Sequence, residues 1–159
     1  MREELDKLLC AKYPEIFADR DKSMQETAMC WGFEHGDGWF EIINQLCANI
    51  QHHIDWSKKN HDWDIAYNEK HLDEQRTVRE VVSQVVAVQI KEKFGTLRFY
   101  YDGGDEAVDG MVRMAESMSA VTCETCGSPG VQRGGGWIRT LCDTHEAEYQ
   151  NRFLKKEVE

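Results

Sequence analysis

The sequence predicts an α+β protein in which helices pack on a central antiparallel β-hairpin or small sheet. Two patterns carry this prediction. Apolar residues recur at helical spacing in the first third of the chain, whereas Val, Ile, Phe and Tyr are concentrated between residues 78 and 101. A chain of 159 residues suits one domain, or one domain with a small appendage. We place an α+β domain at residues 1–121 and a small module packed on it at residues 122–159.

A helix is predicted from about Gly38 to Ile54, with Asp37 placed to cap its first turn. Its apolar residues share one face: Trp39, Ile42, Ile43, Leu46, Ile50 and Ile54. A shorter helix is predicted within residues 1–20, where three leucines share a face and Pro14 ends or restarts the helix. Residues 55–76 are polar and weakly periodic, which predicts a surface connection.

A long antiparallel hairpin is predicted with its turn near Phe94–Gly95. Ahead of the turn, apolar residues at even positions favour strand alternation: Val82, Val86, Val88 and Ile90. Beyond it, Leu97, Phe99 and Tyr101 would share the face opposite to Thr96, Arg98 and Tyr100. The DGGD segment at 102–105 ends the second strand. A further helix follows, with one apolar face: Val108, Met111, Val112, Ala115 and Met118.

Four residues near the C-terminus have the spacing of a metal site: Cys123-x2-Cys126-x15-Cys142-x2-His145. Structural zinc takes four tetrahedral Cys and His ligands, and a C-x2-C turn directs two thiolates to one point. The spacing therefore predicts bound Zn²⁺. Because protein ligands fill all four positions, the site is expected to be closed and structural, whereas catalytic zinc keeps an open position.

The residues around these ligands predict a treble clef. The C-x2-C turn of Cys123 and Cys126 would form a zinc knuckle. A small hairpin would follow, with Gly134 to Gly136 at or near its turn, and then a charged helix from about Asp143 to Lys155. Such a module is too small for its own apolar core, so the metal should stabilise it. The other cysteines show no paired spacing and are interpreted as buried thiols: Cys10, Cys30 and Cys47.

The charge pattern restricts the partners. The formal net charge of -10 argues against general nucleic-acid binding, which depends on neutralising phosphates. No apolar run approaches the roughly 20 residues that a membrane span needs, and the N-terminal residues do not read as a secretory signal. A cytoplasmic protein without a membrane partner is expected. Residues 89–101 nevertheless carry three bases and one acid, which makes a local positive island.

A small anionic ligand is one hypothesis for this island, since Arg and Lys pair with phosphates and aromatic rings stack on bases. The candidate ligand-binding residues are Trp39, Lys91, Lys93, Phe94, Arg98, Tyr100 and Arg139. The alternative is an amphipathic hairpin with solvated lysines. Residues 35–41 also allow two interpretations. Their backbone N–H groups could bind an anion at the start of the helix. Alternatively, the segment is a capped helix start with Trp39 in the core.

Four segments together resemble a family of small phage-encoded proteins: GDGWF, IKEKFGTLRFYYDG, AESMSAVTCETCG and GWIRTLCDTH. The resemblance covers about Cys30 to His145. It implies a non-enzymatic accessory protein acting in an infected bacterial cytoplasm. Small phage proteins of this type often counter host defence, some by sequestering nucleotide immune signals.

Three hypotheses for function follow. The first is sequestration of a nucleotide-type signal, with a symmetric homo-oligomer as one way to build a composite pocket. The second is an acidic adaptor that inhibits a host protein, because an acidic surface can mimic nucleic acid. The third is a zinc-clamped nuclease, suggested by His52 and His53. Such nucleases need a histidine general base on a β-ribbon and a metal-ligating His or Asn on the next helix, and the sequence does not supply this pair.

Overall fold

A three-stranded mixed sheet lies at the centre of a computed structural model, which describes residues 1–134 and 136–156, with side chains up to Arg152. Strand β1 (Phe33–Glu34) lies parallel to β2 (Val86–Lys93), and β3 (Thr96–Asp102) pairs antiparallel with β2. The β2–β3 pair is the predicted hairpin. Its turn, Phe94–Gly95, has φ of 54° and 76°, a pair of positive values that matches the twist of the strands.

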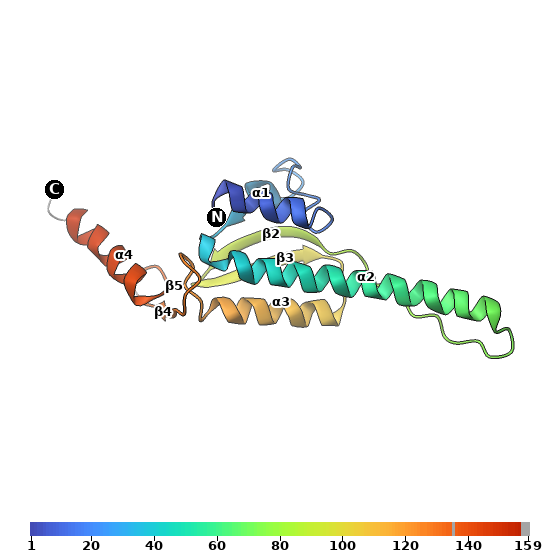
Figure 1. Ribbon diagram of the computed structural model, residues 1–159. Helices are drawn as coiled ribbons and strands as arrows, with labels where there is room; N and C mark the ends of the chain where they lie inside the picture. The colour runs from blue at the N-terminus through green and yellow to red at the C-terminus, as the bar shows by residue number, and fades with distance from the viewer. Residues whose placement is uncertain (135, 157–159) are drawn as a thin grey trace.

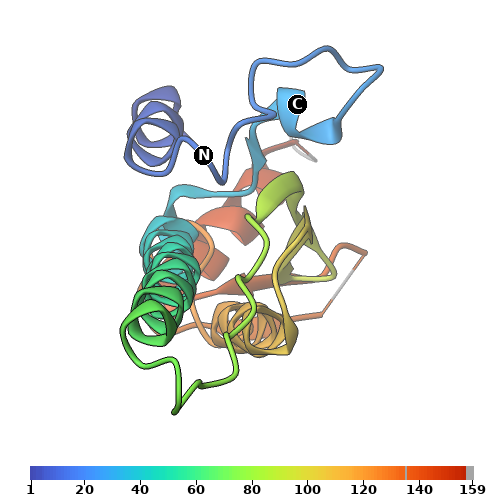
Figure 2. The ribbon, with the colours of Figure 1, turned by 90° about the vertical axis from the view of Figure 1, so that its right-hand side faces the viewer.

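Helices surround this sheet, which confirms the α+β class. The remaining elements are α1 (Glu3–Lys12), η1 (Ala28–Trp31), η2 (Asp37–Trp39), α2 (Phe40–Lys70), α3 (Glu106–Ser119), β4 (Val131–Arg133), β5 (Arg139–Leu141) and α4 (Asp143–Lys156). α2 and α3 run side by side in opposite directions, and α3 packs on β3 (Figures 1 and 2). Within the described ranges, no helix has the length and apolar character needed to cross a membrane.

Strand β2 carries a bulge that changes which residues are buried. The alternation in the sequence placed Val88 and Ile90 on one face. Pairing with β3 shifts between Ala87 and Gln89, however, so that Ala87 and Ile90 are the buried residues. One extra residue in a strand reverses the phase of its alternation, which explains the error. The strand also begins at Val86, later than the pattern indicated.

One apolar core joins the helices to the sheet. Its fully buried large residues include Trp39, Leu9, Ile43, Ile50, Ile54, Ile90, Leu97 and Val108. The N-terminal helix ends at Lys12, shortly before Pro14, as predicted. Of its three leucines only Leu9 is buried, and Leu8 is 53% exposed, so the predicted apolar face is narrower than expected.

Helix α2 continues past Ile54 to Lys70, so the prediction of a surface connection is wrong for residues 55–70. We call residues 55–80 the arm, because the helix and the segment that returns along it extend beyond the rest of the molecule (Figure 1). Asp64 is the buried residue of the arm. Polar contacts therefore stabilise this part of α2. Polar residues produce no apolar periodicity, so this stretch of the sequence showed no sign of the helix.

The returning segment of the arm is tied to α2 by side-chain contacts. Asp64 accepts hydrogen bonds from Nε (2.7 Å) and Nη2 (2.9 Å) of Arg79 and from its backbone N–H (3.1 Å). Asn68 exchanges two hydrogen bonds with the backbone of Arg76, at 2.7 and 2.8 Å. The Arg76 guanidinium lies 4.1 Å from the ring centre of Tyr67. Hydrogen bonds from Arg79 lower the pKa of Asp64 to about 2.

Acid is expected to release this segment. The pKa of Asp64 is lowered in the folded protein, so its pairing with Arg79 stabilises the arm above about pH 4 and this contribution is lost as the pH falls toward 2. Asp64→Asn should lower hydrogen-exchange protection of residues 76–82 at neutral pH. Asp62→Asn, at an exposed carboxylate of the same helix, is the matched control. Equal protection in the two variants would contradict the assignment.

Candidate metal centre and hairpin pocket

The four predicted ligands come together. The ligand atoms of Cys123, Cys126, Cys142 and His145 all lie within 4.8 Å of one another, which is compatible with a metal site. The Cys126 and Cys142 sulfurs are 3.9 Å apart, and the His145 Nδ1 atom lies 3.6 Å from Cys123 Sγ and 3.2 Å from Cys142 Sγ. Tetrahedral zinc bonds of about 2.3 Å to sulfur and about 2.0 Å to nitrogen imply a sulfur–sulfur separation of about 3.8 Å and a sulfur–nitrogen separation of about 3.5 Å. The observed distances lie close to these values, and the one between Cys142 and His145 is the shortest.

Local backbone structure directs the ligands toward one point. Gly127, with φ of 78°, lets the chain turn back after Cys126, and its N–H donates to the Cys123 carbonyl at 2.8 Å. Strands β4 and β5 then form the predicted hairpin, which brings Cys142 to the start of α4. Of the glycines expected at its turn, Gly135 lies outside the described residues. The predicted helix from about Asp143 is confirmed as α4.

The thiols differ in their readiness to ionise. Hydrogen bonds from Ser128 lower the pKa of Cys126 to about 6, and a backbone hydrogen bond from His145 lowers that of Cys142. Burial raises the pKa of Cys123. The pKa of the His145 ring is raised by its hydrogen bond with Cys142. The lowered pKa values of Cys126 and Cys142 make the thiolate, which is the form that binds metals, easier to form at these two sulfurs.

The Gly36–Trp39 loop ahead of α2 packs directly on this cysteine knuckle. The Gly38 N–H donates to the Glu124 carbonyl at 2.7 Å, and the Gly36 N–H donates to the Glu124 carboxylate at 2.9 Å. The indole N–H of Trp39 donates to the Thr122 carbonyl at 2.9 Å. These N–H groups therefore donate to other residues of the same chain. This agrees with the interpretation that the segment is a helix start with Trp39 in the core.

Asp37 has a different role from the expected cap. α2 begins after a 3-10 turn, and its N-cap residue is Trp39, whose side chain makes no capping hydrogen bond. The Asp37 carboxylate instead accepts hydrogen bonds from the backbone N–H of Arg2 at 2.7 Å and from its Nε at 2.5 Å. The prediction that Asp37 caps α2 is wrong, because the extra 3-10 turn separates it from the helix.

A second feature lies at the tip of the β2–β3 hairpin. A pocket of about 570 Å³ is lined by Lys91, Glu92, Lys93, Phe94, Gly136, Trp137 and Ile138. Phe94 and Trp137 are 66% and 63% exposed, which is unusual for residues of this size. The Lys93 ammonium lies 5.5 Å from the ring centre of Phe94. Cationic and aromatic groups thus share one small site, of which Lys91 is a second basic lining residue.

The other candidate residues are partly engaged elsewhere. Arg98 donates to the Thr96 hydroxyl at 2.6 Å and to the Leu97 carbonyl at 2.7 Å. Arg139 lies over the ring of Tyr149, 4.6 Å from its centre. The Lys91 ammonium lies 5.6 Å from the ring centre of Tyr100 on the sheet surface.

Trp39 is fully buried beside the knuckle, away from the hairpin pocket. Sequence reasoning passed over Trp137 and Ile138, which line this pocket. Their signal was an aromatic residue and an apolar residue directly after a run of glycines, in a segment with no helical or strand pattern to bury them.

The two histidines of the nuclease hypothesis have structural contacts. His53 Nε2 lies 2.9 Å from Asp105 Oδ2, and Asp105 also caps α3. The His52 ring stacks on Trp56 at 6.4 Å between centres. Among the described residues, neither histidine joins a second metal-binding cluster.

Comparison with protein-family models, with curated proteins and with solved structures finds no match to this chain. The site must therefore be interpreted from its own geometry.

Proposed function

We propose that the Cys/His cluster holds one structural Zn²⁺ ion in a treble clef. The support is the fit of three ligand separations to tetrahedral zinc, together with the order of knuckle, hairpin and helix along the chain. Cys126, Cys142, Cys123 and His145 would fill four positions and leave no place for a substrate. Zinc would supply cross-linking of the knuckle to α4, and no catalytic step is assigned to it.

We further propose that the protein is a non-enzymatic binder of a small anionic ligand of the nucleotide type. The observation that carries this proposal is the hairpin pocket, which is lined by two lysines and two exposed aromatic side chains. Phe94 and Trp137 would stack on a base, and Lys91 and Lys93 would hold phosphate oxygens. A volume of about 570 Å³ suits a ligand of that size.

The resemblance to small phage-encoded proteins gives this binder a context. We propose that it acts in the cytoplasm of an infected bacterium and sequesters a nucleotide signal of host defence. The pocket supports the chemistry of such a ligand, and the resemblance supports the setting. The first test is mass spectrometry of small molecules released on denaturation, after the purified protein has been exposed to a bacterial nucleotide pool. Release of one nucleotide per pocket would support the proposal.

Two substitutions should then separate stacking from charge. Trp137→Ala is expected to weaken binding of the released nucleotide by about tenfold, since stacking on a base contributes about 1–3 kcal/mol. Lys93→Ala is expected to weaken it and to reduce its salt dependence, because one phosphate contact is lost. Titration calorimetry at two salt concentrations measures both effects.

The matched controls lie outside the pocket: Trp56→Ala, at an exposed tryptophan of α2, and Lys59→Ala, at an exposed lysine of the arm. Unchanged affinity in both pocket variants, or no released nucleotide from a folded protein, would reject the proposed site.

A further inference from the structure

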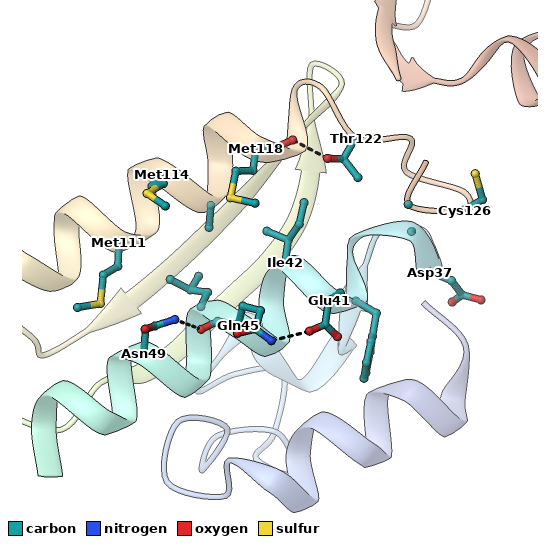
Figure 3. Close-up of a pocket in the computed structure, with 15 residues that line it drawn as sticks. Asp37, Glu41, Ile42, Gln45, Asn49, Met111, Met114, Met118, Thr122 and Cys126 are labelled. Atoms are coloured by element: carbon teal, nitrogen blue, oxygen red, sulfur yellow. Dashed lines mark hydrogen bonds between the residues drawn. The ribbon is translucent and has the colours of Figure 1, made fainter. Parts of the chain in front are cut away.

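A groove between α2 and α3 forms a second surface, which shares no lining residue with the hairpin pocket (Figure 3). Its volume is about 680 Å³. One wall is a stripe of three methionines on α3, Met111, Met114 and Met118, which follow one another at spacings of three and four residues. Such residues lie on one face of a helix. Met114 is 64% exposed and Met118 is 46% exposed, so this wall stands open to solvent.

The opposite wall and most of the floor come from α2. Ile42 and Leu46 of α2 are buried and form an apolar floor together with the buried Ala115 of α3. Gln45 and Asn49 present amide groups along the edge (Figure 3). Unbranched methionines adapt their shape to different apolar side chains, and exposed methionines are typical of grooves that bind amphipathic helices.

The charged side chains that line the groove are acidic. Its described lining residues include two acids, Asp37 and Glu41, and no base. Asp37 is paired with Arg2. Glu41, in contrast, accepts hydrogen bonds from the neutral amides of Asn44 (3.1 Å) and Gln45 (2.6 Å), so its negative charge has no ionic partner among these contacts. A complementary ligand would place a cation at this end.

We infer that this groove binds an amphipathic helix of a partner protein, with apolar anchors along one face and a basic residue at the end that meets Glu41. Met118 follows Met111 by seven positions, a length of about 10 Å or two helical turns. This matches anchors at i, i+3 or i+4, and i+7 of the partner helix. A small apolar molecule fits less well, because drug-sized ligands are enclosed on most of their surface and this wall is open.

This inference stands apart from the nucleotide proposal, since the two surfaces share no residue. The probe is a synthetic helical peptide of about 16 residues with leucines at the three anchor positions and lysines at its ends. A second peptide carries glutamates in place of the lysines. Fluorescence anisotropy of the labelled peptides is expected to show saturable binding of the lysine peptide. The glutamate peptide should bind about tenfold more weakly or not at all.

Two variants locate the binding. Met114→Glu places a charge in the exposed wall and should abolish binding of the lysine peptide without affecting the fold. Glu41→Lys should weaken binding of the lysine peptide and strengthen binding of the glutamate peptide. A general loss of folding cannot produce this exchange of preference. Met24→Glu, at a methionine that is 63% exposed outside the groove, is the control.

The peptide experiments would overturn the inference if the lysine peptide did not bind, if both peptides bound equally, or if Met114→Glu left the binding unchanged. Sedimentation of the protein alone is the last measurement. A dimer that Met114→Glu converts to a monomer would make a second copy of this chain the occupant, and the partner helix would be rejected.

Discussion

Loss of the proposed zinc ion is expected to unfold the C-terminal module and to expose Trp39. Among the described residues from 122 onward, the buried ones are Cys123, Thr140 and Leu141, which is too small a core to hold the knuckle and hairpin. Structural zinc sites of small modules bind their ion with about 10–16 kcal/mol of apparent free energy, most of which appears as folding free energy. We therefore expect Cys142→Ser, or removal of the ion by a chelator, to lower the melting temperature strongly.

The measurement combines metal content with unfolding. Elemental analysis should find one zinc ion per chain of the unmodified protein and much less in Cys142→Ser. Cys30→Ser is the control, because Cys30 lies outside the cluster and bonds only the Thr27 carbonyl through its sulfur, a contact that serine can replace. Thermal unfolding that is insensitive to the chelator would rule out a structural role for the metal.

Gly38→Ala should have the second largest effect. A Cβ at this position would lie 2.1 Å from the Cys123 carbonyl oxygen and 2.5 Å from the Gly127 nitrogen, and both are backbone atoms that cannot move aside cheaply. Overpacking of this kind costs about 3 kcal/mol. In a chain of this length each kcal/mol lowers the melting temperature by about 2–4 °C, so a decrease of about 10 °C is expected.

Gly110→Ala is the matched control for this prediction. Gly110 lies inside α3, and a Cβ there would meet nothing within 4 Å. The substitution should raise stability by up to about 1 kcal/mol, because alanine is the better helix former. Calorimetry of both variants checks the contrast. Gly38→Ala should also bind zinc more weakly than the unmodified protein does, and equal melting temperatures for the two variants would disprove the close packing.

The sequence predicted those parts of the molecule whose signals are local. The spacing of Cys123, Cys126, Cys142 and His145 predicted a cluster that the structure brings together. Helical spacing located the buried half of α2, and Gly95 located the turn of the hairpin. In each case the signal lies within one short stretch of the sequence.

Other features depend on contacts with residues far along the chain, and local sequence patterns do not indicate such contacts. The helix beyond Ile54 is held by contacts such as Asp64 with Arg79, 15 residues later. Strand β1 is two residues long, too short to show alternation. Nothing local indicated that the Gly36–Trp39 loop would pack on Glu124, 88 residues away from Gly36.

Helix α2 runs without a break from the proposed metal centre to the far end of the arm. It contains 31 residues, which is a length of about 46 Å. One end of this rod is fixed to the knuckle through the Gly36–Trp39 loop, and the other lies beyond the body of the protein (Figure 1). A tilt of about 5° where the rod starts would swing its last turn by about 4 Å. Because Ile43, Ile50 and Ile54 of the same helix are fully buried, such a tilt would have to move the core with it, so the rod couples the position of the arm to the packing of the whole body.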